Sequence, residues 1–154
     1  AKIIHHFFDM VEFCPTEKNG IVNTEELEKW VIKFKEILDA NDQSSYFGFL
    51  LGRLWAYAPI GKDGRYPCEA VRLIIEKYSD EDMLSEYEIT VRNQRGVYNP
   101  SAGQEEKNIA EKYKENADYL SLKYPNTAKV FYELYRTYMK ESENERISAE
   151  NGYF

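Results

Sequence analysis

Apolar residues recur every three or four positions along most of the chain, which is the spacing that places side chains on one face of a helix. The clearest example is residues 24–40, where one stripe is apolar and the opposite face is charged. The apolar stripe consists of Leu27, Trp30, Val31, Phe34, Ile37 and Leu38. Asn23 precedes this stretch and Glu26 follows three residues later, which is typical of a capping box at a helix start.

The same periodicity predicts further helices over residues 1–13, 44–57, 67–78, 80–93, 103–123 and 125–148. Ser79 is the expected N-cap of the helix over 80–93. A short link that contains Pro125 joins the last two helices, so they should pair as an antiparallel hairpin. The chain is therefore predicted to be all-α, with about six helices in an antiparallel bundle or a short helical array.

Residues 44–57 are apolar on nearly all sides, which predicts a central, buried helix. Gly48 and Gly52 lie on one face of it, and each costs about 1 kcal/mol of helix stability relative to alanine. We interpret them as sites where a neighbouring helix approaches closely. Arg53 is the only charged residue in this segment, so it needs either a structural carboxylate or a ligand as its partner.

The stretch YAPIGKDGRYPCEAVRLIIE, residues 57–76, combines a turn with a helix start. Asp63-Gly64 is a tight-turn signal, Gly61 adds backbone freedom, and Pro67 suits the first turn of the next helix. The free N–H groups of that helix start, together with the loop's two cations, would suit an anion or a peptide. The alternative is a purely structural turn, because the strand and the Lys-Ser/Thr ending of a P-loop are missing.

A second polar cluster, Arg92 to Arg95, lies at the end of the helix predicted over 80–93. Cations at that position complement the negative end of the helix dipole. The alternative is that Asn93 and Arg95 form a surface pocket together with the 61–65 loop.

The length of 154 residues suits one domain, and we predict a single helical domain over residues 1–154. Hydrophobic residues make up 43% and charged residues 31%, a globular composition. The chain begins at Ala1 with hydrophobic residues at once, so we expect it to be excised from a longer protein. The net charge of −7 repels a phosphate backbone and argues against nucleic acid as a partner.

Cys14 and Cys68 have no cysteine-rich framework around them, which is typical of reduced thiols in a cytoplasmic protein; whether they pair stays open. No run approaches the ~20 apolar residues of a membrane span, so no membrane contact is expected. Zinc, calcium, P-loop and nucleophile-elbow motifs are missing, so neither a metal nor a cofactor is expected. A helix start would lower the thiol pKa of Cys68, but no histidine can be placed beside it to act as a base. We interpret His5 and His6 as structural residues. No catalytic residue is therefore assigned.

The segment GKDGRYPCEAVRLIIE, with the later VRNQRGVYNP and GQEEKNIAEKY, resembles uncharacterised bacterial all-helical domains that often lie C-terminally in a larger protein. The residues that match its GxDGxxPxEAVR pattern are Gly61, Asp63, Gly64, Pro67, Glu69, Ala70, Val71 and Arg72. The resemblance spans roughly the last two thirds of the chain. It implies an all-helical fold and a bacterial origin, and it brings no known activity.

Two functional hypotheses follow. The first is a non-catalytic helical interaction module of a larger bacterial protein, which binds another protein or another domain of the parent chain. The alternative is a pocket that binds or processes an anionic ligand, phosphate-like or nucleotide-like, through an arginine cluster. The residues predicted for such a ligand site are Arg53, Lys62, Asp63, Arg65, Glu69, Arg72, Asn93 and Arg95.

Overall fold

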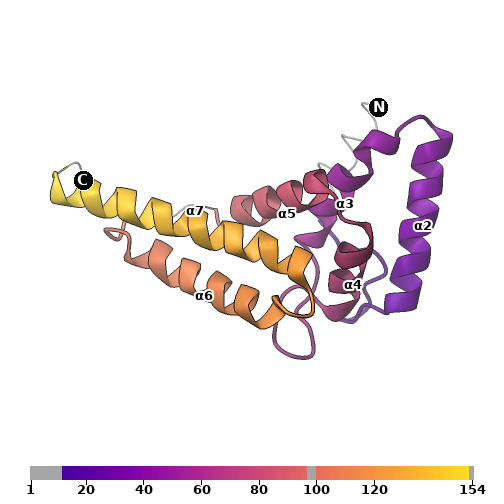
Figure 1. The fold of residues 1–154 in the computed structure, drawn as a ribbon, viewed down its shortest axis with the longest axis horizontal. Coiled ribbons are helices and arrows are strands. Elements are labelled where there is room, and N and C mark those ends of the chain that lie inside the picture. Colours follow the sequence, from indigo (N-terminus) through magenta and orange to yellow (C-terminus); the bar gives the residue numbers. More distant parts are fainter. Residues whose placement is uncertain (1–11, 97–99, 153–154) are drawn as a thin grey trace. The chain divides into compact units, whose positions relative to one another are not determined.

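The computed structural model of the protein describes residues 12–96 and 100–152. Within these ranges the chain forms six α-helices and one short 3-10 helix, with no strand (Figure 1). The prediction of an all-α fold with about six helices is confirmed. The helix predicted over residues 1–13, with both histidines, lies outside the described residues except for positions 12 and 13, which are not helical.

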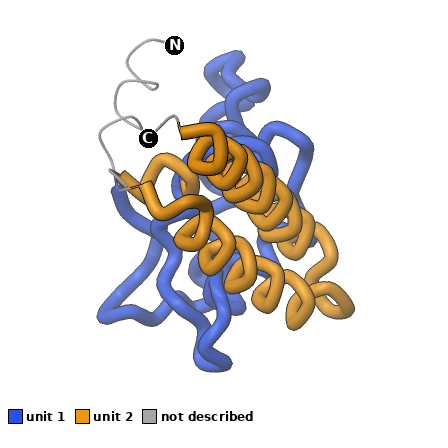
Figure 2. Tube along the Cα trace, turned by 90° about the vertical axis from the view of Figure 1, so that its left-hand side faces the viewer, with its two compact units in different colours: residues 1–90 blue, residues 91–154 orange. Residues whose placement is uncertain are grey.

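The chain divides into two compact units, Ala1–Thr90 and Val91–Phe154, which Figure 2 shows in different colours. The division falls inside helix α5 (Glu81–Asn93), whose last three residues belong to the second unit. One domain over the whole chain stays a prediction.

Helix α2 (Thr24–Ala40) begins and ends where the hydrophobic pattern predicts. The side chain of Asn23 accepts a hydrogen bond from the backbone N–H of Glu26 at 3.0 Å, which satisfies one of the unpaired donors at the helix start. Of the apolar stripe, Leu27, Val31 and Leu38 are buried. Ile37 is half-exposed, so the stripe is wider than the face that this helix buries.

A 3-10 turn (Ser44–Tyr46) leads into helix α3 (Phe47–Trp55), in which seven of the nine residues are buried. The prediction of a buried central helix is confirmed. At its end, the indole N–H of Trp55 points to the sulfur of Met83 at 3.4 Å, so even the polar atom of this side chain meets another helix.

The two glycines of α3 are explained by the close approach of α5. A methyl group at Gly52 would overlap the backbone carbonyl oxygen of Met83 and lie 3.0 Å from the backbone nitrogen of Tyr87. A methyl group at Gly48 would overlap the carboxylate of Asp80, just before α5. The interpretation as a site of close helix approach is confirmed for Gly52, whereas at Gly48 the neighbour is the side chain of Asp80, one residue before α5.

We expect Gly52→Ala to lower the free energy of unfolding by about 1–3 kcal/mol, since the backbone of α5 must move to make room. This loss should exceed the gain of about 1 kcal/mol that alanine brings to a helix interior. Urea denaturation measures the difference. Gly48→Ala is the comparison, because there the backbone of α5 need not move and the expected loss is that of the hydrogen bond between Asp80 and the N–H of Met83. Stabilisation by Gly52→Ala would show that the two helices are not in contact at this position.

Helix α4 (Glu69–Tyr78) begins two residues later than predicted. Pro67 follows a cis peptide bond and belongs to the preceding loop, while Cys68 is the N-cap. The N-cap prediction for α5 was also wrong by one residue. Asp80 accepts the hydrogen bond from the backbone N–H of Met83 at 2.8 Å, and Ser79 instead ends α4. The charge of Asp80 also suits the positive end of the helix dipole.

The second unit contains α6 (Gln104–Leu120) and α7 (Pro125–Glu150), which lie side by side as an antiparallel hairpin, as predicted (Figure 1). The buried residues of α6 are mostly small, such as Ala110 and Ala117, whereas those of α7 include Phe131 and Leu134. Small side chains on one helix leave room for large ones on the other, so the two helices can pack closely.

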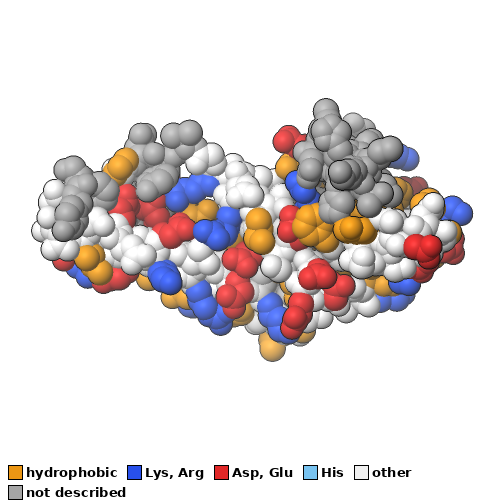
Figure 3. Space-filling view, turned by 90° about the horizontal axis from the view of Figure 1, so that it is seen from above, with side chains coloured by type: hydrophobic (Ala, Val, Ile, Leu, Met, Phe, Trp, Pro, Cys, Tyr) orange, Lys and Arg blue, Asp and Glu red, His pale blue; other side chains and the backbone are white. Residues whose placement is uncertain are grey.

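Figure 3 shows a face on which carboxylates and cations are interspersed, without a large area of one sign. In the described part of the chain, no helix combines the length and the apolar character that a bilayer crossing requires.

Candidate functional site

The first unit contains a closed loop between α3 and α4, residues 59–68, which we call the 59–68 loop. Its ends are joined, because the backbone N–H of Cys68 donates to the carbonyl of Pro59 at 2.9 Å. Within it, the N–H of Gly61 donates to the carbonyl of Arg65 at 2.8 Å. Gly64 has a φ of +75°, which only glycine adopts readily, and this confirms the predicted Asp63-Gly64 turn.

The side chain of Arg72, in α4, binds the inner side of this loop. Its side chain is only 1% exposed, and it forms a paired contact with the carboxylate of Asp63, at 2.7 and 2.8 Å. Its remaining donors reach the carbonyl of Pro67 at 2.6 Å and that of Arg65 at 2.9 Å. A buried guanidinium is tolerated only when paired in this way, so Arg72 is a structural clamp on the loop.

Two further groups complete the clamp. The Glu69 carboxylate accepts the backbone N–H of Lys62 at 3.1 Å, and the Asp63 carboxylate accepts the N–H of Arg65 at 3.1 Å. Gly61 lies where these groups converge. A methyl group there would come within 2.7 Å of Asp63 and 2.9 Å of Arg72. The GxDGxxPxEAVR pattern is therefore the sequence of one hydrogen-bonded unit.

The outer face of the loop combines apolar and cationic side chains. Ile60 is 48% exposed and Tyr66 is 52% exposed, although both are large hydrophobic residues. Lys62 is exposed between them, and Arg65 is half-buried. The loop whose backbone the clamp holds thus carries side chains of both apolar and positive character.

The other predicted site residues lie elsewhere. Arg53 is in the first unit, where its guanidinium pairs with Glu86 at 3.9 Å and lies 5.8 Å from the ring centre of Phe49. The ion-pair alternative for Arg53 is thereby supported. Asn93 and Arg95 belong to the second unit, and Asn93 is exposed. The eight candidates therefore include one cluster of five around the 59–68 loop.

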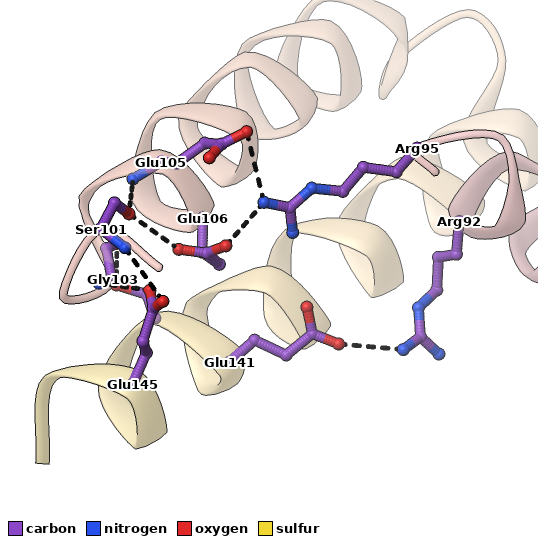
Figure 4. Close-up of polar contacts among 9 residues, drawn as sticks. Arg92, Arg95, Ser101, Gly103, Glu105, Glu106, Glu141 and Glu145 are labelled. Atoms are coloured by element: carbon purple, nitrogen blue, oxygen red, sulfur yellow. Dashed lines mark hydrogen bonds and ion pairs between the residues drawn. The ribbon is translucent and has the colours of Figure 1, made fainter. Parts of the chain in front are cut away.

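Arg95 is part of a second polar cluster, at the open end of the α6–α7 hairpin (Figure 4). Its guanidinium pairs with Glu106 at 2.6 Å and with Glu105 at 3.4 Å. Glu145 of α7 accepts the backbone N–H groups of Ser101 at 3.1 Å and of Gly103 at 2.5 Å. The carboxylate of Glu145 therefore binds the loop that starts α6 and holds that loop to α7.

Sequence reasoning missed both buried carboxylates of this cluster. Glu106 stands among charged residues that are typical of a solvated helix face, yet it is only 2% exposed. Its position along the helix could have indicated burial. Glu106 lies one turn before Ala110, on the same buried face of α6 as Ala110 and Ala117. Glu145 likewise follows Tyr138 at a spacing of two turns. A carboxylate in phase with a buried stripe needs a cation nearby, which here is Arg95.

The pKa of Glu106 predicts how this cluster responds to acid. Burial raises that pKa, but the hydrogen bond and the positive charge of Arg95 outweigh burial and hold it below the ordinary value of 4.5. Because the folded state favours the charged form of Glu106, the stabilisation that this carboxylate provides is complete above pH 4.5 and is lost as the pH falls through the lowered pKa.

We expect Glu106→Gln to be less stable than wild type at neutral pH, and the difference in the free energy of unfolding should shrink in acid. Chemical denaturation between neutral and acidic pH measures this, and a constant difference would contradict it.

The surroundings of Cys68 oppose ionisation of its thiol. Cys68 is buried at the N-cap of α4, and burial raises its pKa in spite of the N–H groups of Val71 and Ala70 that lower it. The helix start lowers this pKa, as expected, but burial outweighs that effect. Within residues 12–96 and 100–152, no group of His, Cys, Asp and Glu could hold a metal ion.

Comparisons with known proteins do not assign this chain to a family. No protein-family model matches the chain. No curated protein and no solved structure is significantly similar to it. The likeness to bacterial helical domains stays a prediction, and function must be argued from the two clusters themselves.

Proposed function

We propose that the chain is a non-catalytic helical interaction module of a larger bacterial protein, and that the 59–68 loop is the surface its partner contacts. The partner is another protein or another domain of the parent chain. The module acts in the cytoplasm, where Cys14 and Cys68 stay reduced; both are free thiols in this structure.

The observation that carries this proposal is the Arg72 clamp beneath an exposed loop. Ordering a flexible residue costs about 1–2 kcal/mol of backbone entropy. A loop that the fold has already ordered avoids this cost on binding, so its contacts contribute more fully to affinity. A buried arginine that holds a loop without any catalytic group beside it is best explained by such preorganisation.

The chemistry of the outer face supports a protein partner. Exposed tyrosine and arginine are typical of residues that dominate interface energies, because they combine apolar area with polar tips. Ile60 and Tyr66 call for an apolar surface on the partner, and Lys62 and Arg65 call for carboxylates at its rim. The net charge of −7 makes a phosphate backbone a poor alternative.

The arginine-cluster alternative receives less support. The donors of Arg72 are directed to Asp63 and to the carbonyls of the loop, and its side chain is almost fully buried. Arg53 faces Glu86. A phosphate or nucleotide at the loop would therefore have to bind without two of the predicted arginines.

Photo-crosslinking tests the proposal in the full-length parent chain expressed in its own cells. A photo-reactive phenylalanine analogue at position 66 should give a discrete crosslinked product, identified by mass spectrometry. The same analogue at Tyr119 is the matched control, because that side chain is 53% exposed, as against 52% for Tyr66. No product from position 66, or equal products from both positions, would contradict the proposal.

The partner so identified allows a quantitative measurement. We expect the double variant Ile60→Ser, Tyr66→Ser to weaken binding by about 2 kcal/mol or more, roughly thirtyfold in Kd. Leu122→Ser is the control, since Leu122 is a fully exposed apolar residue in the second unit. An unchanged Kd for the loop variant would place the interface elsewhere.

A further inference from the structure

A hollow of about 360 Å³ opens in the second unit, apart from the 59–68 loop. This volume is at the lower end of the range for small-molecule pockets. Its walls include the aliphatic side chains of Val91 and Ile109 and the rings of Tyr113 and Tyr138. The hollow is therefore mostly hydrocarbon, which suits the apolar body of a small ligand.

The charged residues that line the hollow are both positive. Arg95 and Lys112 border it, and no carboxylate among the described residues does, on a chain whose net charge is −7. Arg95 is fixed there, because Glu106 pairs with its guanidinium at 2.6 Å (Figure 4). The central carbon of the guanidinium also lies 5.4 Å from the ring centre of Tyr138. Lys112 is exposed, and among the described residues it has no carboxylate partner.

A neutral donor lies beside these cations. In the described part of the chain the hydroxyl of Tyr113 makes no hydrogen bond, although its ring packs 6.0 Å from Phe131 and 5.7 Å from Tyr138. Burial, together with nearby Tyr138, raises the pKa of Tyr113 to about 12, so the hydroxyl keeps its proton at neutral pH. Gln94 contributes a side-chain amide to the same rim. Donors and positive charge thus line the same hollow as the apolar side chains.

We propose that this hollow binds a small carboxylic acid with an apolar body, the carboxylate accepting from Lys112 and Tyr113 and the body lying against Val91, Ile109 and the tyrosine rings. Arg95 acts as a fixed positive charge behind the site and as part of its floor. A carboxylate fits better than a phosphate monoester, because a doubly charged, strongly hydrated group would gain little from walls that are mostly hydrocarbon. The site does not depend on the interaction proposed for the 59–68 loop.

A ¹H–¹⁵N NMR titration of the full chain with 4-ethylbenzoate tests the proposal. We expect saturable shifts at the backbone N–H groups of Val91, Ile109, Lys112 and Tyr113. Hydrogen bonds to a charged group contribute about 1.5–3 kcal/mol, so the neutral analogue 4-ethylbenzamide should bind roughly tenfold more weakly or worse. Inorganic phosphate, which has no apolar body, should bind more weakly still.

Two variants probe the donors separately. Lys112→Met and Tyr113→Phe should each raise the Kd for 4-ethylbenzoate roughly tenfold, and Lys140→Met, an exposed lysine of α7, should leave it unchanged. Both test variants preserve side-chain volume, and the wild-type comparison of acid with amide stands even if one of them fails to fold. The proposal is overturned by non-saturable shifts, by equal binding of acid and amide, or by variants that bind as wild type does.

Discussion

Replacing Arg72 with methionine should lower the free energy of unfolding by about 3–5 kcal/mol, the cost of removing one partner from a buried ion pair. Methionine fills similar space but leaves the carboxylate of Asp63 and the carbonyls of Pro67 and Arg65 without their donors. The 59–68 loop should lose its fixed conformation. Urea denaturation measures the loss, and hydrogen exchange at the N–H groups of Gly61 and Cys68 reports the loop directly.

Arg53→Met is the matched control in the same unit. Its guanidinium is partly exposed and lies 3.9 Å from Glu86, so we expect a loss of about 1 kcal/mol or less. A double variant Arg72→Met, Asp63→Asn should recover part of the stability, because no charge is then left unpaired. Equal losses for Arg72→Met and Arg53→Met would show that Arg72 does not clamp the loop.

The second large effect is expected at Arg95. Arg95→Met leaves Glu106 buried without its cation, which should cost about 3 kcal/mol. Much of the loss should disappear in acid, where Glu106 binds a proton and no longer needs a cation. Denaturation of wild type and variant at neutral and acidic pH separates the two contributions.

Arg92→Met is the control for this experiment. Arg92 also pairs with a glutamate of the second unit, Glu141 at 3.0 Å, but both side chains are exposed to solvent. An exposed pair contributes about 0–1 kcal/mol and is screened by salt. If the Arg92 variant lost as much stability as the Arg95 variant, burial of the carboxylate could not be the cause.

Much of the fold followed from local patterns. The stripe of α2, the cap at Asn23, the two glycines of α3 and the hairpin of α6 and α7 are all where the sequence predicted them. These features depend on residues a few positions apart, whose relative directions a helix dictates. The errors at Pro67 and Ser79 concern helix starts, where neighbouring turn residues compete for the same role.

The candidate site was harder to predict. The sequence placed three of the eight residues in the 59–68 loop and two in the helix that follows it, but it left open whether they bind a ligand or form a structural turn. A charged cluster beside glycines has the same composition whether it binds an anion or closes on itself. The direction of the Arg72 side chain decides between a ligand site and a self-contained loop. That side chain points into the protein beneath the loop, where it is only 1% exposed. Glu106 was missed for the related reason that most charged residues on a helix are solvated.

By itself, the sequence determined which segments are helical, which face of each is apolar, and where the chain turns. The tertiary structure alone decided which charges are buried and what each one pairs with. Glu145 meets the N–H group of Ser101 across 44 positions of the chain, and Glu106 meets Arg95 across the turn before α6. Helical periodicity reports only the direction of a side chain relative to its near neighbours, whereas the pairing of a buried charge depends on which distant segment packs opposite it.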